Sequence, residues 1–434
     1  MIASIGKIHP LPLLLLLATW STLLLLAGCG SGNSSVLNPL TTTSNTAASV
    51  PVNLPVNSTQ TSSGQSNVMP LYVDGGIATL ASYPNGVFTN VTVCLPATRQ
   101  CNTIDHVLVD TGSVGLRLLA HSAGGELTLP LPAVTENGKP LYECLQFADG
   151  YTWGSINSAT VQLGQETTPT LPIQVIGNNT QLIPPSCTQN AVQNTPENDL
   201  ASLGTNGILG VGVFTQDCGA TGCMPLPYYA CTTTACNDNI VPALQNMVQN
   251  PVSMLPQDNN GLIMELPAIP TIGSALVNGQ LLLGVNTRSD NQFPTGQLLT
   301  LDPSTGYLGG STWNGNTFAT SYVDSGTSVF EVGSTLIKNC SSISFSCPTA
   351  TLPIQAAIFD TNGVTQTISF DIANATALFN QNPNYVAFND LGATAPDNNT
   401  LVLGMPFFYG TQVAELIGSS NGSTGGQVGF TPLQ

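Results

Sequence analysis

The chain has 434 residues, of which only 7% are charged: 6 Lys and Arg against 23 Asp and Glu, for a formal net charge of −17. Nucleic-acid binding needs a basic surface that displaces counterions from phosphates, and so few cations do not supply one. The same shortage excludes electrostatic docking on anionic lipids. The length allows one large or two medium domains with an ample core.

The N-terminal residues have the pattern of an export signal. Lys7 provides a small positive region, and an apolar run from Leu11 to Leu26 follows it. The run ends in the quartet Leu26 to Cys29 (LAGC), which resembles the lipobox of bacterial lipoproteins, where cleavage before the cysteine frees its thiol for lipid attachment. An uncleaved anchor helix and an ordinary secretory signal are the alternatives.

This resemblance implies a signal peptide over residues 1–28, lipidation at Cys29 and a lipid-anchored tether over residues 29–67. Gly30 follows the cysteine, which under the sorting rule for such lipoproteins favours the outer membrane of a bacterial cell envelope. The tract from 31 to 67 is rich in Ser, Thr, Asn, Val and Pro and has no hydrophobic periodicity, as expected of a tether. No later run is apolar and long enough to span a bilayer, so we expect membrane contact through the lipid only.

The chain has 11 cysteines, and ten remain when Cys29 is set aside, an even number in a compartment that permits disulfides. Close spacing favours four pairs: Cys94 with Cys101, Cys218 with Cys223, Cys231 with Cys236, and Cys340 with Cys347. Cys144 and Cys187 are then left for each other. The cysteines between 218 and 236 could pair differently, or could bind zinc. Because zinc sites prefer tighter CxxC knuckles, we expect disulfides and no metal.

From Met69 onward, short alternating or apolar stretches bounded by Gly, Pro and Asn predict strands. Examples are Val87 to Leu95, His106 to Val109, Ser158 to Leu163, Leu171 to Ile176, Gly261 to Leu266, Gln280 to Gly284, Thr365 to Ile372 and Leu401 to Leu403. Helices are predicted at Ile240 to Val248, Gly333 to Asn339 and Ala375 to Asn380. The body is therefore expected to be all-β with few short helices.

An internal repetition is the most informative feature of the sequence. Two turns with the pattern D-[ST]-G-[ST] each follow an apolar strand: Asp110, Thr111, Gly112 and Ser113 in the first half, and Asp324, Ser325, Gly326 and Thr327 in the second. Far downstream of each turn come two apolar residues and a glycine, at Ile208 to Gly210 and at Val402 to Gly404. A single such turn is most often an Asx turn, whereas two copies with matching triplets indicate a duplicated site.

Two such turns that face each other across a pseudo-twofold axis would bring the carboxyl groups of Asp110 and Asp324 within hydrogen-bonding distance. Like charges that close do not both ionise cheaply, so the pair shares one proton and its pKa values separate. One group then takes a proton from a water while the other protonates a substrate carbonyl oxygen. The neighbouring hydroxyl groups would orient the carboxylates. This chemistry hydrolyses a peptide bond without a covalent intermediate or a cofactor.

Over nearly all of Leu71 to Gln434, the chain resembles the pepsin-type aspartic peptidases that have both lobes in one chain. Besides the two turns, the similar segments are Asn206 to Gly210 (family D-G-I-L-G), Leu401 to Gly404 (W-I-L-G), Gln427 to Leu433 (the last strand) and Thr160 to Gly164 (the strand after the flap). The resemblance implies a bilobal fold, with an N-terminal β lobe over 68–265 and a C-terminal β lobe over 266–434. It also implies catalytic roles for Asp110 and Asp324, a peptide or protein substrate in the cleft between the lobes, and a monomer.

Two positions depart from the family's pattern. Counting back from the strand after it, the flap consists of Phe147, Ala148, Asp149 and Gly150. Phe147 stands where the family usually has a tyrosine, and Arg117 stands where it has the tryptophan that bonds this tyrosine. We hypothesise that an ion pair between Arg117 and Asp149 replaces that interaction. These changes put flap closure in question, because closure completes the site.

Several other residues have weaker signals. Tyr151 and Trp153 lie close to the flap and could line the cleft, or could simply pack within the hairpin. His106 and His121 flank the first turn, but no Ser or Cys nucleophile motif accompanies them, so structural roles are expected. The segment Asp258 to Gly261, with Glu265, fails the EF-hand spacing and is expected to be a solvated hairpin turn.

Three functions follow from these observations. The first is an envelope-anchored aspartic endopeptidase, favoured by the two intact aspartate turns. The second is a pepsin-like lipoprotein that hydrolyses little or nothing and binds peptides or proteins, favoured by the altered flap and by the lack of a recognisable basic propeptide. The third is a structural envelope module, because a fold alone does not fix a function.

Overall fold

The computed structural model describes residues 66–433, apart from 190–194, 219–225, 237 and 420–421. The predicted signal peptide (1–28), the lipidation site Cys29 and all but the end of the predicted tether (29–67) lie outside the described residues. Within the described ranges, no helix is both long and apolar enough to cross a bilayer.

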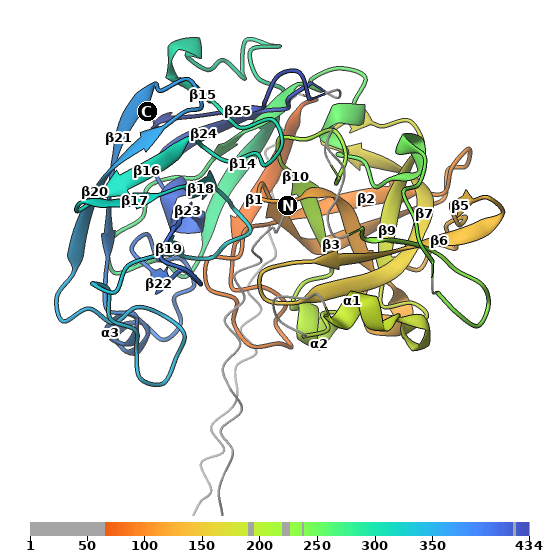
Figure 1. The fold of residues 1–434 in the computed structure, drawn as a ribbon, viewed down its shortest axis with the longest axis horizontal. Helices are drawn as coiled ribbons and strands as arrows, with labels where there is room; N and C mark the ends of the chain where they lie inside the picture. The colour runs from red at the N-terminus through yellow and green to blue at the C-terminus, as the bar shows by residue number, and fades with distance from the viewer. Residues whose placement is uncertain (1–65, 190–194, 219–225, 237, 420–421, 434) are drawn as a thin grey trace, which may run out of the picture. The chain divides into compact units, whose positions relative to one another are not determined.

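Strands make up most of the regular structure, as predicted (Figure 1). They are β1 (Val68–Val73), β2 (Phe88–Cys94), β3 (Cys101–Asp110), β4 (Val114–Leu119), β5 (Thr135–Glu136), β6 (Lys139–Gln146), β7 (Tyr151–Leu163), β8 (Glu166–Thr167), β9 (Leu171–Ile176), β10 (Gly207–Val211), β11 (Tyr228–Ala230), β12 (Asp238–Asn239), β13 (Gly261–Glu265), β14 (Val277–Leu283), β15 (Leu298–Thr300), β16 (Gly310–Trp313), β17 (Asn316–Phe318), β18 (Thr320–Val323), β19 (Phe330–Val332), β20 (Leu352–Phe359), β21 (Thr365–Ile372), β22 (Gly392–Thr394), β23 (Thr400–Leu403), β24 (Thr411–Leu416) and β25 (Gln427–Pro432). The α-helices are α1 (Pro185–Gln189), α2 (Leu200–Leu203) and α3 (Ala375–Gln381). Each predicted strand overlaps an observed one.

Of the predicted helices, only the one at 375–380 is confirmed, as α3. The prediction for 240–248 was wrong: Pro242 interrupts the segment, and only a 3-10 turn at Leu244–Asn246 forms. The prediction for 333–339 was also wrong. There the chain turns back on itself, and a β-bridge joins Asn339 to Ser346.

One large sheet contains strands from both ends of the chain. β1 pairs with β14, and β24 pairs with both β13 and β25. β13 ends at Glu265 and pairs with β14, so strand pairing runs across the lobe boundary expected at residue 265. All described residues belong to one compact unit.

The same arrangement of three strands surrounds each aspartate turn. In the first half, β10 runs parallel to β3 and antiparallel to β4. In the second half, β23 runs parallel to β18 and antiparallel to β19. The register pairs Gly210 with Asp110 and Leu403 with Val323. Each downstream triplet therefore lies directly beside the strand that leads to an aspartate.

The end of β3 and the whole of β10 and β23 are buried on both faces, which explains their continuous apolar sequences. Val107, Leu108 and Val109 have no exposed surface, and neither have Ile208 and Leu209. Such burial fixes where each strand ends, and with it the position of the turn that follows.

The disulfides expected from cysteine spacing are present where the structure describes both partners. They are Cys94–Cys101, Cys144–Cys187, Cys231–Cys236 and Cys340–Cys347. Cys218 is disulfide-bonded as well, while Cys223 lies outside the described residues. In the part of the chain that the structure describes, no group of three or more His, Cys, Asp or Glu could hold a metal ion.

We expect removal of Cys144–Cys187 to destabilise the protein more than removal of Cys94–Cys101. The first closes a loop of 43 residues and the second a loop of 7, so the unfolded chain regains more entropy when the first is lost. Loop-closure entropy gives losses of about 4 and about 2 kcal/mol. Denaturant unfolding of the two paired Cys→Ser variants measures both losses, and equal losses would contradict the prediction.

Candidate active site

The carboxyl groups of Asp110 and Asp324 meet in the interior, Asp110 at the end of β3 and Asp324 directly after β18. Neither residue has exposed surface. A methyl group on the Cα atom of Gly112 would lie 2.5 Å from Cγ of Asp324, and one on Gly326 would lie 2.6 Å from Oδ1 of Asp110. Each motif therefore needs glycine, because the carboxyl group of the other motif occupies the space of a side chain.

Each aspartate is held by the same two hydrogen bonds from its own turn. Oδ1 of Asp110 accepts from the Gly112 backbone N–H at 2.8 Å, and its Oδ2 accepts from the Ser113 hydroxyl. Asp324 repeats this arrangement. Its Oδ1 accepts from the Gly326 N–H at 2.7 Å, and its Oδ2 accepts from the Thr327 hydroxyl at 2.6 Å. These contacts fix the plane of both carboxyl groups.

Reciprocal hydrogen bonds lock the two turns together. The backbone N–H of Thr111 donates to Oγ of Ser325 at 3.1 Å, and the backbone N–H of Ser325 donates to Oγ1 of Thr111 at 3.1 Å. The Ser325 hydroxyl in turn donates to the carbonyl oxygen of Val109 at 2.7 Å. A small hydroxyl residue after each aspartate is therefore a structural requirement of the pairing.

The surroundings of the two aspartates separate their pKa values. Burial raises the pKa of both, because an ionised carboxylate loses its hydration. The charge of Asp110 raises the pKa of Asp324 further, to well above its usual range. Hydrogen bonds from Ser113, Asp324 and the Gly112 N–H, together with the charge of Arg117, oppose the rise at Asp110. The pair therefore shares a proton, and Asp324 is the member whose pKa is raised more strongly.

Arg117 lies on β4 with no exposed surface, and its guanidinium group faces two buried acids. Its Nη2 donates to Glu143 at 3.0 Å and to Asp217 at 3.4 Å. Asp217 also accepts a hydrogen bond from the Tyr228 hydroxyl at 2.7 Å. Burial and the neighbouring Glu143 raise the pKa of Asp217 well above its usual range, although Arg117 lowers it.

The hypothesis of an Arg117–Asp149 ion pair was therefore wrong, because Glu143 and Asp217 are the acidic partners of Arg117 in the structure. Glu143 lies within β6, whereas Asp149 lies beyond the end of β6 in the turn that leads to β7. Arg117 on β4 still contacts the flap hairpin, but it does so through Glu143 within β6 rather than through Asp149 in the turn.

The predicted flap, residues 147–150, forms the turn between β6 and β7. It packs against the rest of the structure. Phe147 has no exposed surface and belongs to an apolar cluster with Tyr83 and Phe88. The Phe147 N–H donates to the carbonyl oxygen of Gly150 at 2.8 Å. Outside the hairpin, the Tyr151 N–H donates to the Thr195 carbonyl oxygen at 3.0 Å. A backbone segment from another part of the chain therefore runs along the flap.

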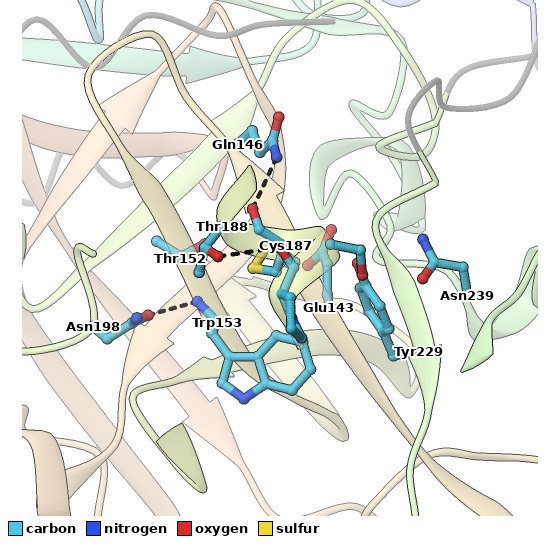
Figure 2. The surroundings of a disulfide bond; sticks show 12 residues. Glu143, Gln146, Thr152, Trp153, Cys187, Thr188, Asn198, Tyr229 and Asn239 are labelled. Atoms are coloured by element: carbon cyan, nitrogen blue, oxygen red, sulfur yellow. Dashed lines mark hydrogen bonds between the residues drawn. A yellow bond between two sulfur atoms is a disulfide. The ribbon is translucent and has the colours of Figure 1, made fainter. Parts of the chain in front are cut away.

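Figure 2 shows how the flap hairpin is fastened close to its turn, around Cys187. The Cys144–Cys187 disulfide joins β6 to α1, and the Gln146 side chain donates to the Cys187 carbonyl oxygen at 3.1 Å. The backbone N–H of Trp153 donates to Oδ1 of Asn198 at 2.6 Å. Trp153 is fully buried and stacks on Tyr142, and Tyr151 is buried as well, so both pack within the hairpin rather than along an open cleft.

The sequence profile of one family matches residues 63–430, a range that contains both aspartate turns and the flap hairpin. The chain belongs to the family described as protein of unknown function (DUF3443). A search of curated proteins finds no match to it. The matched range begins near the end of the predicted tether. The segment of this chain that matches the family is therefore the folded part that contains the candidate site.

Two acidic or phenolic residues near the aspartates of this DUF3443 member were missed by the sequence analysis. The first is Tyr83, whose pKa is raised by burial and by the charges of Asp149, Glu197 and the aspartate pair. The second is Glu415 on β24, which has 4% of its surface exposed. The only sequence signal for Glu415 is a carboxylate in an otherwise uncharged strand, in a chain with few charges.

The remaining candidates have structural roles in this DUF3443 member. His121 contacts the Gly125 carbonyl oxygen at 3.2 Å. Asp258 accepts from Nε of Arg288 at 2.5 Å, as well as from the Thr287 hydroxyl, so the calcium-like segment is a turn held by an ion pair. Glu265 accepts from the side chain of Gln280 at 2.7 Å.

We expect Arg117→Met to cost about 3–5 kcal/mol of stability, because it leaves Glu143 and Asp217 buried without a countercharge. The loss should be smaller at pH 5 than at pH 8, since burial raises the pKa of Asp217 and its protonation removes uncompensated charge. Arg99→Met is the control: Arg99 is exposed and has no ion-pair partner among the described residues, so its loss should change stability by about 0.5 kcal/mol or less. Denaturant unfolding at both pH values measures the differences. Equal losses for the two variants would contradict this account of Arg117.

His106 provides a second prediction, on pH dependence. Burial lowers its pKa, but hydrogen bonds to Asp105 (2.8 Å) and Asp74 (3.2 Å) outweigh burial and raise the pKa to about 9. The stabilisation should therefore be complete below pH 6.5 and lost as pH rises through 9. Melting temperatures of the wild type and His106→Gln, compared from pH 6 to pH 10, should converge at the alkaline end. A constant difference would contradict the charge assignment.

Proposed function

We propose that the protein is an aspartic endopeptidase of the pepsin type that hydrolyses peptide bonds through a water activated by Asp110 and Asp324. The observation that carries the proposal is the buried carboxyl pair, which two interlocked turns orient and in which the pKa of Asp324 is raised well above its usual range. An acid and a base that coexist at one pH are what general acid–base hydrolysis requires.

In this mechanism Asp110 takes a proton from a water molecule while the oxygen of that water attacks the substrate carbonyl carbon. Asp324 gives its proton to the carbonyl oxygen, which produces a neutral tetrahedral diol. As the diol collapses, one of its hydroxyl groups returns a proton to Asp324 and re-forms the C=O bond, the C–N bond breaks, and the leaving nitrogen takes up the proton that Asp110 bears, so that the pair regains its starting state. The hydroxyl groups of Ser113 and Thr327 keep both carboxyl groups in position during these steps.

The bilobal arrangement and the cellular location belong to the same proposal. The repeated unit of three strands around each aspartate supports two pseudo-twofold-related lobes, and the pairing of β24 with β13 supports a sheet that joins them. The sequence Leu26 to Cys29 supports a lipoprotein held in the cell envelope, with the outer membrane favoured. The substrate would be a peptide or protein segment in an extended conformation.

The alternative is a module that binds peptides or proteins and hydrolyses little. It is favoured by the absence of exposed surface at both aspartates and by the fastening of the flap hairpin through Cys144–Cys187 and Arg117. A substrate reaches the carboxyl pair only if this hairpin moves. If the hairpin stays closed, binding would be confined to the outer surface.

We expect the purified chain to cleave denatured protein or a peptide library between acidic and neutral pH, and a statine-type inhibitor to block cleavage. Asp324→Asn and Asp110→Asn should each lower kcat/KM by at least about 100-fold, because each removes one partner of the proton transfer. Asp371→Asn, on exposed strand β21, is the matched control and should leave the rate unchanged.

Cleavage that survives Asp324→Asn would overturn the peptidase proposal. Absence of cleavage together with saturable peptide binding, measured by fluorescence anisotropy with a labelled peptide, would support the binding module instead.

A further inference from the structure

Glu415 is a buried acid that the proposed hydrolysis does not use. It lies on β24, paired with Leu262 of β13 on one side and with Val428 of β25 on the other. Only 4% of its surface is exposed, and its Oε1 atom has no hydrogen-bond partner among the described residues. A carboxyl group in such a position is costly to keep ionised, so its presence in the central sheet requires an explanation.

Glu415 and the first aspartate turn both line a cavity of about 40 Å3. Thr111 and Gly112 form one wall of the cavity, and Tyr307 and Tyr322, whose rings stack at 5.2 Å, form another. The remaining lining is mostly apolar. The volume is sufficient for one or two water molecules, and the carboxyl group and the polar turn supply the partners that a buried water needs.

Thr111 connects this cavity to the carboxyl pair. Its hydroxyl group lies within hydrogen-bonding reach of the Glu415 carboxyl group and also accepts the hydrogen bond from the Ser325 N–H. Thr111 follows Asp110 directly in the chain. A change at Glu415 is therefore transmitted to the residue that locks the two turns together.

We propose that Glu415 is a positioning residue for the carboxyl pair: in its neutral, proton-bearing form it holds water in the cavity and keeps Thr111 in the orientation that locks the two turns. This inference rests on the proposed function, because the pair that Glu415 positions is the pair assigned to hydrolysis. Three carboxyl groups, Asp110, Asp324 and Glu415, then act as one buried acid cluster.

The charge state of Glu415 sets the pH range of this role. Burial raises the pKa of Glu415 to about 8, and although the Thr111 hydroxyl lowers it, the charge of Asp110 raises it further. The titratable groups that face it are Asp110, with Asp324 beyond, and the phenols Tyr307 and Tyr322. Its neighbours on β13 and β25 carry no charge. Ionisation of Glu415 above about pH 8 would place a second negative charge beside Asp110 and disrupt the shared proton.

The first test compares Glu415→Ala with Glu415→Gln, an uncharged residue of nearly the same shape. We expect Glu415→Ala to lower kcat about tenfold or more with little change in KM, and Glu415→Gln to restore most of that loss. In Glu415→Gln the alkaline limb of the kcat/KM profile should move to higher pH. Asp390→Asn, which removes another buried acid that does not line the cavity, is the control and should leave the profile unchanged. A Gln variant as impaired as the Ala variant, or with an unmoved alkaline limb, would overturn the positioning role.

The second test does not depend on activity. A group with a raised pKa in the folded state stabilises the fold below its unfolded value and loses that contribution as pH rises. The stability of the wild type relative to Glu415→Gln should therefore fall between pH 4.5 and 8. Asp390 has a pKa raised to about 6, so the stability of the wild type relative to Asp390→Asn should stop falling by pH 6. Melting temperatures across this range measure both curves.

The two tests separate the inference from the function on which it rests. Parallel stability curves for the wild type and Glu415→Gln would show that Glu415 bears no proton, and would overturn the inference even in an active peptidase. Diverging curves in a chain that cleaves nothing would support the proton on Glu415 and would overturn the hydrolytic function together with the positioning role.

Discussion

The site depends on the reciprocal hydrogen bonds between Thr111 and Ser325, which join two turns 214 residues apart in the chain. Two carboxyl groups in a dry interior repel each other when both are ionised, so they stay in contact only if the backbone holds them there. The interlocked turns provide that restraint, and Gly112 and Gly326 leave the space for it. Proton sharing is the electrostatic consequence of this geometry.

Buried acids recur around the pair, and the protein neutralises them in two ways. Glu143 and Asp217 share the single cation Arg117, and Asp258 has Arg288. In the part of the chain that the structure describes, Asp324 and Glu415 have no cation among their contacts, and burial raises the pKa of both, which favours their neutral, protonated forms. A chain with 6 Lys and Arg against 23 Asp and Glu has few cations to place inside, so protonation replaces ion pairing at the centre of the molecule.

Local patterns in the sequence were sufficient for much of the fold. Strands such as 171–176 and 365–372 follow from alternation and bounding turns, and the short disulfide loops follow from cysteine spacing. The two aspartate turns were identified because they repeat. Local patterns do not predict contacts that depend on which strands pair. Glu143 and Asp217, the acids that bind Arg117, lie 26 and 100 residues from it, so no spacing rule indicates them. The predicted helix at 333–339 failed for the same reason, because the bridge from Asn339 to Ser346 overrides local preference.

The scarcity and placement of cations also affect how the protein responds to trypsin, which cuts only after Lys and Arg. Arg117 is inside a buried strand, and Arg288 is held by Asp258. Arg99 is exposed, but a cut there falls within the ring closed by Cys94 and Cys101, so the two fragments stay covalently joined. Lys139 is followed by Pro140, a bond that trypsin does not cut, whereas Lys338 is exposed and lies outside the ring closed by Cys340 and Cys347. Among the described residues, Lys338 is therefore the site at which trypsin should divide the folded chain. Even after denaturation it yields only a few very long fragments, and mapping its disulfides requires a protease that cuts at other residues.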